Sequence, residues 1–304
     1  IEKLSFDGTT YRLLTDGDTA ETELASAADG SNIIIVGAEV DENGTNNGSR
    51  FLETYRDSRV SNPDSVEIIG STFFSGGEGN GDILVHRDGG GELDLTVLDS
   101  VFSDATTGVF VTGSTGPTDG TVRIEGNTFT KLSAGIGGLQ EIVSGASVEI
   151  KGNTFDDLNE AVGLNGQGGG SLSFTDNRFG GEKDSSIKWF DGDFGGTGEI
   201  VFDPLDPADL LADTFDFSNL PGIDSSETVS SSSVTSFDDE ANGAASFFTT
   251  GSQVVVQSNG TDSRIFVDAD DDAGSDGALD SDDLQITITG ISNLTDVENA
   301  IFTG

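Results

Sequence analysis

The side chains with the clearest potential for chemistry are aspartates gathered between positions 268 and 283. This segment contains eight aspartates and no basic residue. So many carboxylates on one short segment repel one another strongly unless a hard cation with several oxygen ligands neutralises them. The alternate spacing of Asp268, Asp270 and Asp272 allows three carboxylates to converge on one ion. We therefore expect calcium as the cofactor of this segment.

The aspartate segment departs from an EF-hand loop, because its sixth position is Ala273 instead of Gly and its twelfth is Leu279 instead of Glu. A solvated acidic loop without a bound ion is the alternative interpretation. If calcium binds, the candidate ligands are Asp268, Asp270, Asp272, Asp276, Asp280 and Asp282.

Three basic side chains are candidates for acid–base chemistry. Arg123 and Lys151 occupy outward positions in two similar strand segments, with Glu125 and Glu149 beside them. A base or a charge neutraliser is possible there, but a cross-strand charge ladder is the favoured interpretation. The single histidine, His86, lies next to Arg87 and is interpreted as a surface residue. No catalytic residue is therefore assigned beyond these weak candidates.

The charge balance narrows the possible partners. The chain has 55 acidic and 13 basic residues and a formal net charge of -42. Such a chain repels nucleic acid, so nucleic-acid binding is not expected. An acidic surface that keeps the protein dissolved in salt accounts for the same charge. The longest aliphatic run, at 33–36, is far too short to cross a bilayer, so no membrane insertion is expected.

A repeated phrase indicates how these side chains are positioned. It reads apolar, any, apolar, any, small or Asp, Asn or Ser, any, Phe. Its five copies end at Phe73, Phe102, Phe129, Phe155 and Phe179, at intervals of 29, 27, 26 and 24 residues. Such a period predicts a stacked solenoid.

Within one copy, the alternation predicts a strand with one buried face. Val122 and Ile124 then point inward, while Arg123 and Glu125 point to water. A turn follows, and a second apolar strand comes seven or eight residues after the phenylalanine. A ladder of hydrogen bonds between coils is expected at the recurrent turn position, which is occupied by Ser71, Ser100, Asn127, Asn153 and Asn177.

This pattern resembles the right-handed parallel β-helix repeat family over residues 33–202. The implied fold class is all-β, with an N-terminal cap at 1–32. Many members of this family cleave or epimerise acidic polysaccharides, and their sites use Lys or Arg, often with calcium. The resemblance therefore implies a polysaccharide lyase or C5-epimerase as one alternative function. Whether this chain is an enzyme stays open, and we lean against it because cations are few.

The composition shifts after residue 202. Residues 203–245 are interpreted as a cap and a linker rich in Ser and Asp, and residues 246–304 as a small antiparallel β module. Four strands are expected in this module, at 246–248, 253–256, 264–267 and 284–288. We expect the module to form a separate unit that binds calcium.

The C-terminal segment also resembles the closing module of repeat-in-toxin (RTX) proteins exported by type I secretion. The matching stretches are 265–270, 284–290, 294–296 and 300–302. The family's glycine-rich nonapeptides are absent, so a calcium β-roll is not supported. The resemblance implies an uncleaved export signal and calcium-triggered ordering outside the cell. The lack of Cys excludes disulfides, so calcium is the expected staple.

Together these features favour an extracellular or cell-surface protein that binds calcium and has a structural or adhesive role. Exposed solenoid ends predict a homo-oligomer or polymer, as a filament or a surface layer. A cell-surface or extracellular polysaccharide is a further possible partner. The second alternative to the structural role is a non-catalytic glycan-binding module.

Overall fold

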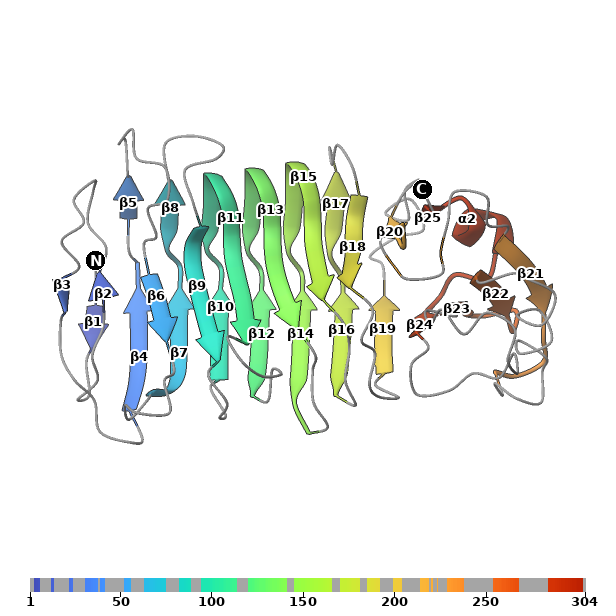
Figure 1. The fold of residues 1–304 in the computed structure, drawn as a ribbon, viewed down its shortest axis with the longest axis horizontal. Helices are drawn as coiled ribbons and strands as arrows, with labels where there is room; N and C mark the ends of the chain where they lie inside the picture. The colour runs from blue at the N-terminus through green and yellow to red at the C-terminus, as the bar shows by residue number, and fades with distance from the viewer. Residues whose placement is uncertain are drawn as a thin grey trace.

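The computed structural model describes the strands, the turns between many of them and one short helix. The described residues are 3–5, 12–13, 22–23, 31–37, 39–41, 52–55, 63–74, 82–88, 94–113, 120–140, 145–165, 170–180, 185–191, 199–203, 214–218, 220, 223, 229–237, 254–267 and 284–302. They form a solenoid whose strands lie side by side from the N-terminus towards the C-terminus (Figure 1). The predicted all-β fold is confirmed.

One wall of the solenoid is a sheet of mainly parallel strands, called sheet A. Its middle strands each have five residues and alternate between buried and outward-facing side chains. In spatial order, sheet A contains β1 (Lys3–Ser5), β4 (Ser31–Val36), β7 (Pro63–Ile69), β10 (Asp94–Leu98), β12 (Thr121–Glu125), β14 (Ser147–Lys151), β16 (Ser171–Thr175), β19 (Glu199–Asp203), β24 (Leu284–Ile288), β23 (Ser263–Val267), β22 (Val254–Ser258) and β21 (Val229–Ser233).

The opposite wall, called sheet B, is built from the segments that contain and follow the phenylalanines. Its main path contains β25 (Ile301–Phe302), β20 (Phe215–Asp216), β18 (Ser185–Asp191), β15 (Thr154–Asn165), β13 (Thr128–Gln140), β11 (Val101–Gly113), β9 (Asp82–Asp88), β6 (Leu52–Tyr55), β2 (Arg12–Leu13) and β3 (Thr22–Glu23). Beside this path lie β5 (Glu39–Asp41), β8 (Thr72–Phe74) and β17 (Arg178–Gly180).

The two strands expected in each coil after the turn are joined in the middle of the solenoid. β11, β13 and β15 each run continuously for 12 or 13 residues. They change direction at a left-handed residue two positions after the phenylalanine, namely Asp104, Lys131 or Asp157, with φ between 54° and 56°. One long bent strand therefore replaces a strand, a turn and a second strand. The third side expected at 140–143 lies outside the described residues beyond Gln140.

The turn between the sheets repeats from coil to coil because its first residue has a positive φ in every copy. Gly70, Gly126 and Gly152 supply this conformation in three copies, and Asp99 and Asp176 in the other two. Glycine and aspartate tolerate the left-handed region better than most residues do. At Gly126 a side chain would also collide with Asp99, whose Oδ1 lies 2.5 Å from the position of an added Cβ.

The repeated phenylalanines form one continuous stack inside the solenoid. Successive ring centroids from Phe73 to Phe179 are 5.1 to 5.3 Å apart, and the rings are nearly parallel. All five side chains are buried. This spacing is close to the distance between neighbouring strands in a sheet, so each ring covers the next without a gap.

The expected ladder at the turn is also confirmed. Asn153 Oδ1 accepts hydrogen bonds from the main-chain N–H and the side-chain Nδ2 of Asn127, at 2.9 and 3.0 Å. Asn153 Nδ2 donates to the carbonyl oxygen of Ile124 at 2.8 Å. Asn127 and Asn177 repeat this pattern, and Ser100 accepts from the N–H of Ser71. Each of these side chains satisfies main-chain groups that the turn leaves without a strand partner.

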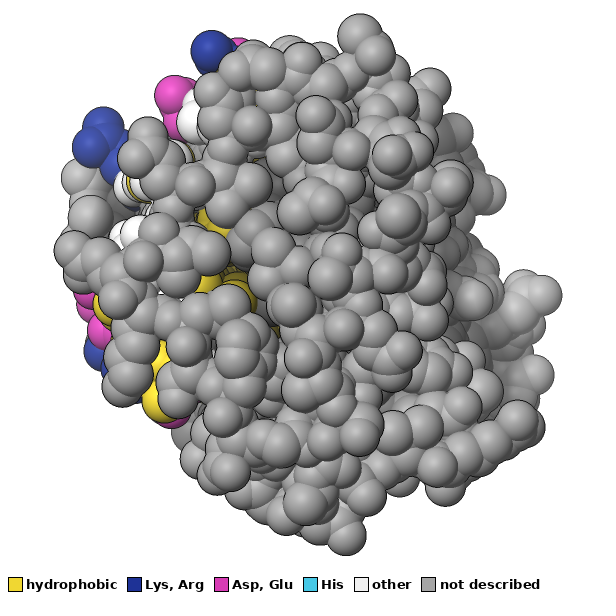
Figure 2. Space-filling model, turned by 90° about the vertical axis from the view of Figure 1, so that its left-hand side faces the viewer, with side chains coloured by type: hydrophobic (Ala, Val, Ile, Leu, Met, Phe, Trp, Pro, Cys, Tyr) yellow, Lys and Arg dark blue, Asp and Glu magenta, His cyan; other side chains and the backbone are white. Residues whose placement is uncertain are grey.

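The interior is apolar and the exterior is charged. Val122, Ile124, Val148 and Ile150 are at most 1% exposed, as their alternation predicted. In the view from the N-terminal end, some apolar side chains are visible between the surrounding atoms, and acidic and basic side chains lie along the left edge (Figure 2).

The C-terminal strands extend the sheets of the solenoid. β23 is antiparallel to both of its neighbours, β22 and β24, as expected, and β24 also pairs in parallel with β19. Similarly, β25 pairs in parallel with β20. Residues 284–302 therefore contribute a strand to each sheet, as a coil does, although residues 204–283 separate β19 from β24 in the sequence. The expected strand at 246–248 lies outside the described residues.

The helix α2 (Leu294–Glu298) lies between these two closing strands. Asn293 caps its N-terminus, since Asn293 Oδ1 accepts a hydrogen bond from the N–H of Thr295. Val297 is fully buried. The inward residues of β24, which include Ile286 and Ile288, are likewise buried, so the last segment of the chain covers the open end of the β-helix core.

Replacing Asn153 with Ala should destabilise the fold by about 2 to 4 kcal/mol, because buried main-chain groups of Ile124 and Asn127 lose their partners. Asn153→Ser should cost less, since Ser71 and Ser100 occupy the same turn position in other coils. Urea unfolding followed by circular dichroism measures both changes. Equal losses in the two variants would contradict a role for this side chain in hydrogen bonding.

Replacing Ile286 with Ala should reduce stability by about 2 to 5 kcal/mol, because the side chain fills the closing coil. Thr287→Ala is the matched control, since Thr287 is in the same strand and faces outward; its effect should stay within about 0.5 kcal/mol. Thermal unfolding by calorimetry measures the difference. Two equally stable variants would show that β24 is not needed to close the core.

Candidate functional site

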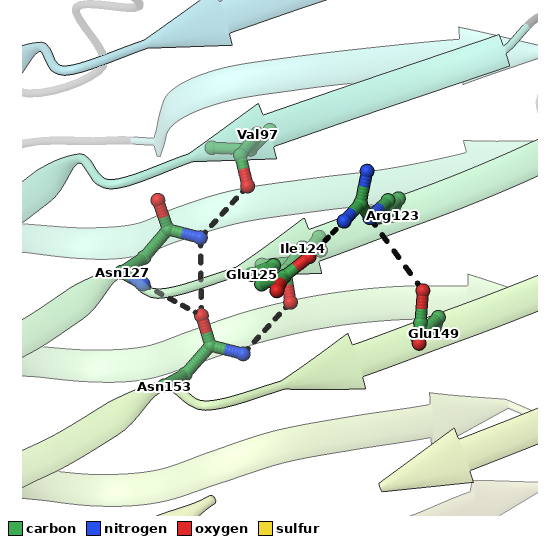
Figure 3. A network of polar contacts seen from close by, with 7 residues as sticks. All are labelled: Val97, Arg123, Ile124, Glu125, Asn127, Glu149 and Asn153. Carbon is green, nitrogen blue, oxygen red and sulfur yellow. Dashed lines mark hydrogen bonds and ion pairs between the residues drawn. The ribbon is translucent and has the colours of Figure 1, made fainter. Parts of the chain in front are cut away.

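The outer face of sheet A brings together the basic and acidic residues singled out from the sequence. Arg123 on β12 and Glu149 on β14 are register partners on neighbouring strands. Arg123 Nε lies 3.6 Å from Glu149 Oε2, and its guanidinium also contacts the Glu125 carboxylate. Figure 3 shows the guanidinium between these two carboxylates. The side chains are between 30 and 46% exposed.

Lys151 is the register partner of Glu125, as Glu149 is of Arg123. The four positions therefore alternate in sign along and across the two strands. For Arg123, this arrangement confirms the cross-strand charge ladder. The carboxylates of Glu125 and Glu149 offset the positive charge with which Arg123 would attract an acidic substrate.

The strands below this charged group are held rigidly. Asn127 and Asn153 follow β12 and β14 directly, and their amides point into the turn, away from Arg123 (Figure 3). Both are 1% exposed. Hydrogen bonds of these buried asparagines thus hold the backbone that carries the charged side chains, while the charged groups themselves are exposed to solvent.

The outer positions around the charged group carry hydroxyl and carboxylate groups. Thr96 on β10 and Ser173 on β16 continue the row of Arg123 and Glu149. Asp94 accepts a hydrogen bond from the N–H of Thr121 at 2.8 Å. None of these outer neighbours is basic, so Lys151 is the second cation beside Arg123 on β12 and β14.

His86 lies on the other wall of the solenoid. It is in β9 of sheet B, in register with Val111 of β11, whereas Arg123 and Lys151 are in sheet A. The topology therefore does not combine the three basic candidates into one site. The side chain of His86 lies outside the described residues.

The six aspartates predicted as calcium ligands lie outside the described residues, so the calcium site remains a prediction. The structure does describe both ends of their segment. Val267, the last residue of β23, pairs with Leu284, the first residue of β24. The aspartate segment is therefore the loop of a β-hairpin whose ends are adjacent. In the part of the chain that is described, no three His, Asp or Glu side chains gather as a metal site would require.

An ion pair between a partly exposed lysine and a buried aspartate was not predicted from the sequence. Lys188 Nζ on β18 lies 3.3 Å from Asp216 Oδ2 on β20. The sequence did contain a signal for a strand here, because Asp216 alternates with Phe215 and Phe217, which are both fully buried. Beside this pair, Trp189 is fully buried and packs on Phe217 with ring centroids 4.9 Å apart. Trp189 thus fills the apolar core at this end of the coils.

Another cation serves packing in the C-terminal strands. The guanidinium of Arg264 lies 4.9 Å from the ring centroid of Phe237 and 5.9 Å from that of Phe266. Such contacts stabilise a partly desolvated cation. Arg264 is therefore held against aromatic rings of the fold. None of the helices in the described ranges is both long enough and apolar enough to span a membrane.

Comparison with known proteins agrees with the fold. Residues 82–201 match the family model described as "Right handed beta helix region". The matched segment extends from β9 to β19, where the parallel coils are most regular. The fold is thus that of a right-handed parallel β-helix. Neither the curated proteins nor the solved structures include a match to the chain.

The charge ladder should contribute little to stability, because its side chains are substantially exposed. A double-mutant cycle of Arg123→Met and Glu149→Gln is expected to give a coupling energy of about 0 to 1 kcal/mol that weakens as salt rises. Urea unfolding at low and high sodium chloride measures it. A coupling energy of several kcal/mol that resists salt would contradict this description of a solvated ladder.

Proposed function

We propose that this protein is a non-catalytic structural or adhesive protein of the cell exterior, built on the β-helix as a rigid rod. The observation that carries the proposal is the state of Arg123, the best cationic candidate, whose charge is neutralised by Glu125 and Glu149. A lyase or epimerase needs a base and cationic groups that face its acidic substrate. A scaffold needs neither.

Assembly into a filament or layer is the second part of the proposal. β1 and β21 are the last strands at the two ends of sheet A within the described residues. Terminal strands tend to pair with other chains unless they are covered. A contact between the two different ends of one sheet is heterologous, and repetition of such a contact produces an open filament.

Calcium binding by the loop between β23 and β24 is the third part. Because β24 pairs with β19, a change in this loop that favours or hinders the docking of β24 would also favour or hinder the covering of the core beside β19. Eight carboxylates in the loop oppose closure of the hairpin through mutual repulsion. Calcium would remove this repulsion and favour the docked position of β24.

Export by a type I system is proposed from the resemblance of the C-terminal segment to RTX closing modules. The calcium effect suits this route, because free calcium is scarce inside cells and abundant outside. The same residues would serve as an export signal while unfolded and as the closing strands of the β-helix after export.

Calcium should raise the melting temperature of the full chain and promote assembly, whereas a chelator should reverse both. The triple variant Asp268→Asn, Asp270→Asn and Asp272→Asn should lose most of the calcium response. The matched control carries Asp156→Asn, Asp157→Asn and Asp176→Asn, which remove the same charge from the coils. Scanning calorimetry and negative-stain electron microscopy with and without calcium provide the readouts.

An equal calcium response in the triple variant and its control would refute a site in this loop. The enzyme alternative is examined with the same preparation by incubating it with uronic-acid polysaccharides and following unsaturated products. Turnover that disappears in Arg123→Ala or Lys151→Ala would overturn the structural role. Saturable sugar binding without turnover or assembly would favour the glycan-binding alternative.

A further inference from the structure

The ion pair of Lys188 with the buried Asp216 has an arrangement that an ordinary surface ion pair lacks. The two residues are register partners on neighbouring strands, β18 and β20 of sheet B. Their charged atoms are 3.3 Å apart, while the side chains are 22% and 4% exposed. The ammonium and the carboxylate are therefore held together by the sheet and shielded from most of the solvent.

The second oxygen of Asp216 is held by two donors from one residue. Ser218 donates its main-chain N–H to Asp216 Oδ1 at 2.9 Å and its hydroxyl to the same oxygen at 2.6 Å. The carboxyl group thus has a fixed orientation, with Oδ1 on Ser218 and Oδ2 beside Lys188. Two donors on one oxygen are also the arrangement that stabilises a developing oxyanion when a carbonyl carbon is attacked.

Formation of an amide from this pair begins with a proton transfer. Transfer of one proton from Lys188 Nζ to Asp216 Oδ2 produces an amine beside a carboxylic acid. The amine is a nucleophile, and the carbon of the carboxylic acid is an electrophile.

We propose that Lys188 and Asp216 are joined by an intramolecular amide bond in the mature protein. After the proton transfer, Nζ attacks Cγ of Asp216, and the negative charge on Oδ1 is held by the two donors of Ser218. The nitrogen then gives a second proton to Oδ2, and the Cγ–Oδ2 bond breaks with release of one water molecule. The products are a neutral amide and water, so no oxidant or other reactant is needed.

Two physical factors favour this condensation over hydrolysis. Holding the reacting groups together replaces a bimolecular encounter and is equivalent to effective concentrations on the order of 10⁵ M or more. The 4% exposure of Asp216 keeps bulk water from the carboxyl carbon. The bond would link β18 to β20, next to the position where the closing strand β25 is added, in a chain without cysteine.

Mass spectrometry of the denatured full-length protein tests the bond directly. No Lys or Arg lies between Lys188 and Arg264, so trypsin should leave 184–264 uncleaved at Lys188 and lighter by one water molecule. A further cut after Glu199 should leave the two fragments joined. An unmodified chain would instead yield 184–188 and 189–264 as separate peptides.

Lys188→Arg is the matched control, because it keeps the charge but removes the amine nucleophile. Its intact mass should equal the value calculated from its sequence, whereas the wild-type chain should be lighter by one water. Ser218→Ala, which removes the hydroxyl donor, should slow or abolish the mass loss during storage of freshly purified protein. Complete cleavage of the wild-type chain at Lys188, or a loss of water that persists in Lys188→Arg, would overturn the proposal.

Discussion

Each coil depends on its neighbours, because the inner face of one short turn of chain cannot exclude water alone. Two kinds of contact join neighbouring coils, namely the phenylalanine stack and the ladder of asparagine amides. The rings supply apolar contact at the spacing of the strands, and Asn127 and Asn153 supply hydrogen bonds that are satisfied only when the next coil is in register. A shift of one residue would lose both at once, so the stack fixes the register of both sheets.

This constraint separates the interior from the exterior. Inward positions are limited to apolar side chains of suitable size, whereas outward positions in sheet A carry Thr96, Arg123, Glu149 and Ser173 along a single row. Neighbouring positions in this row differ in charge and polarity, so the row does not repeat one kind of binding group. A rod of fixed shape with a strongly acidic and variable surface suits the proposed scaffold role better than it suits a ligand-binding role. The ends of the rod then become the surfaces through which copies of the protein would assemble.

The sequence predicted those features of the fold that lie within each copy of the repeated phrase. The five phenylalanines, the turn positions and the partnership of Arg123 with Glu149 follow from one register, which the repeated phrase specifies. The closing coil was missed because the pairing of β19 with β24 joins segments that are far apart in the chain, and no local pattern encodes it. The contact of Lys188 with Asp216 was missed because it lies beyond the last copy of the phrase, where the spacing between coils is no longer regular.

The position of the closing strands has a consequence for the time course of folding. Coils in the middle of the solenoid pair with segments close in sequence, so they are able to form early, but residues 204–283 separate β24 from its partner β19. Contacts between distant segments are slow to form. The core beside β19 therefore stays exposed until residues 284–302 dock, so this coil is completed later than the coils in the middle of the solenoid.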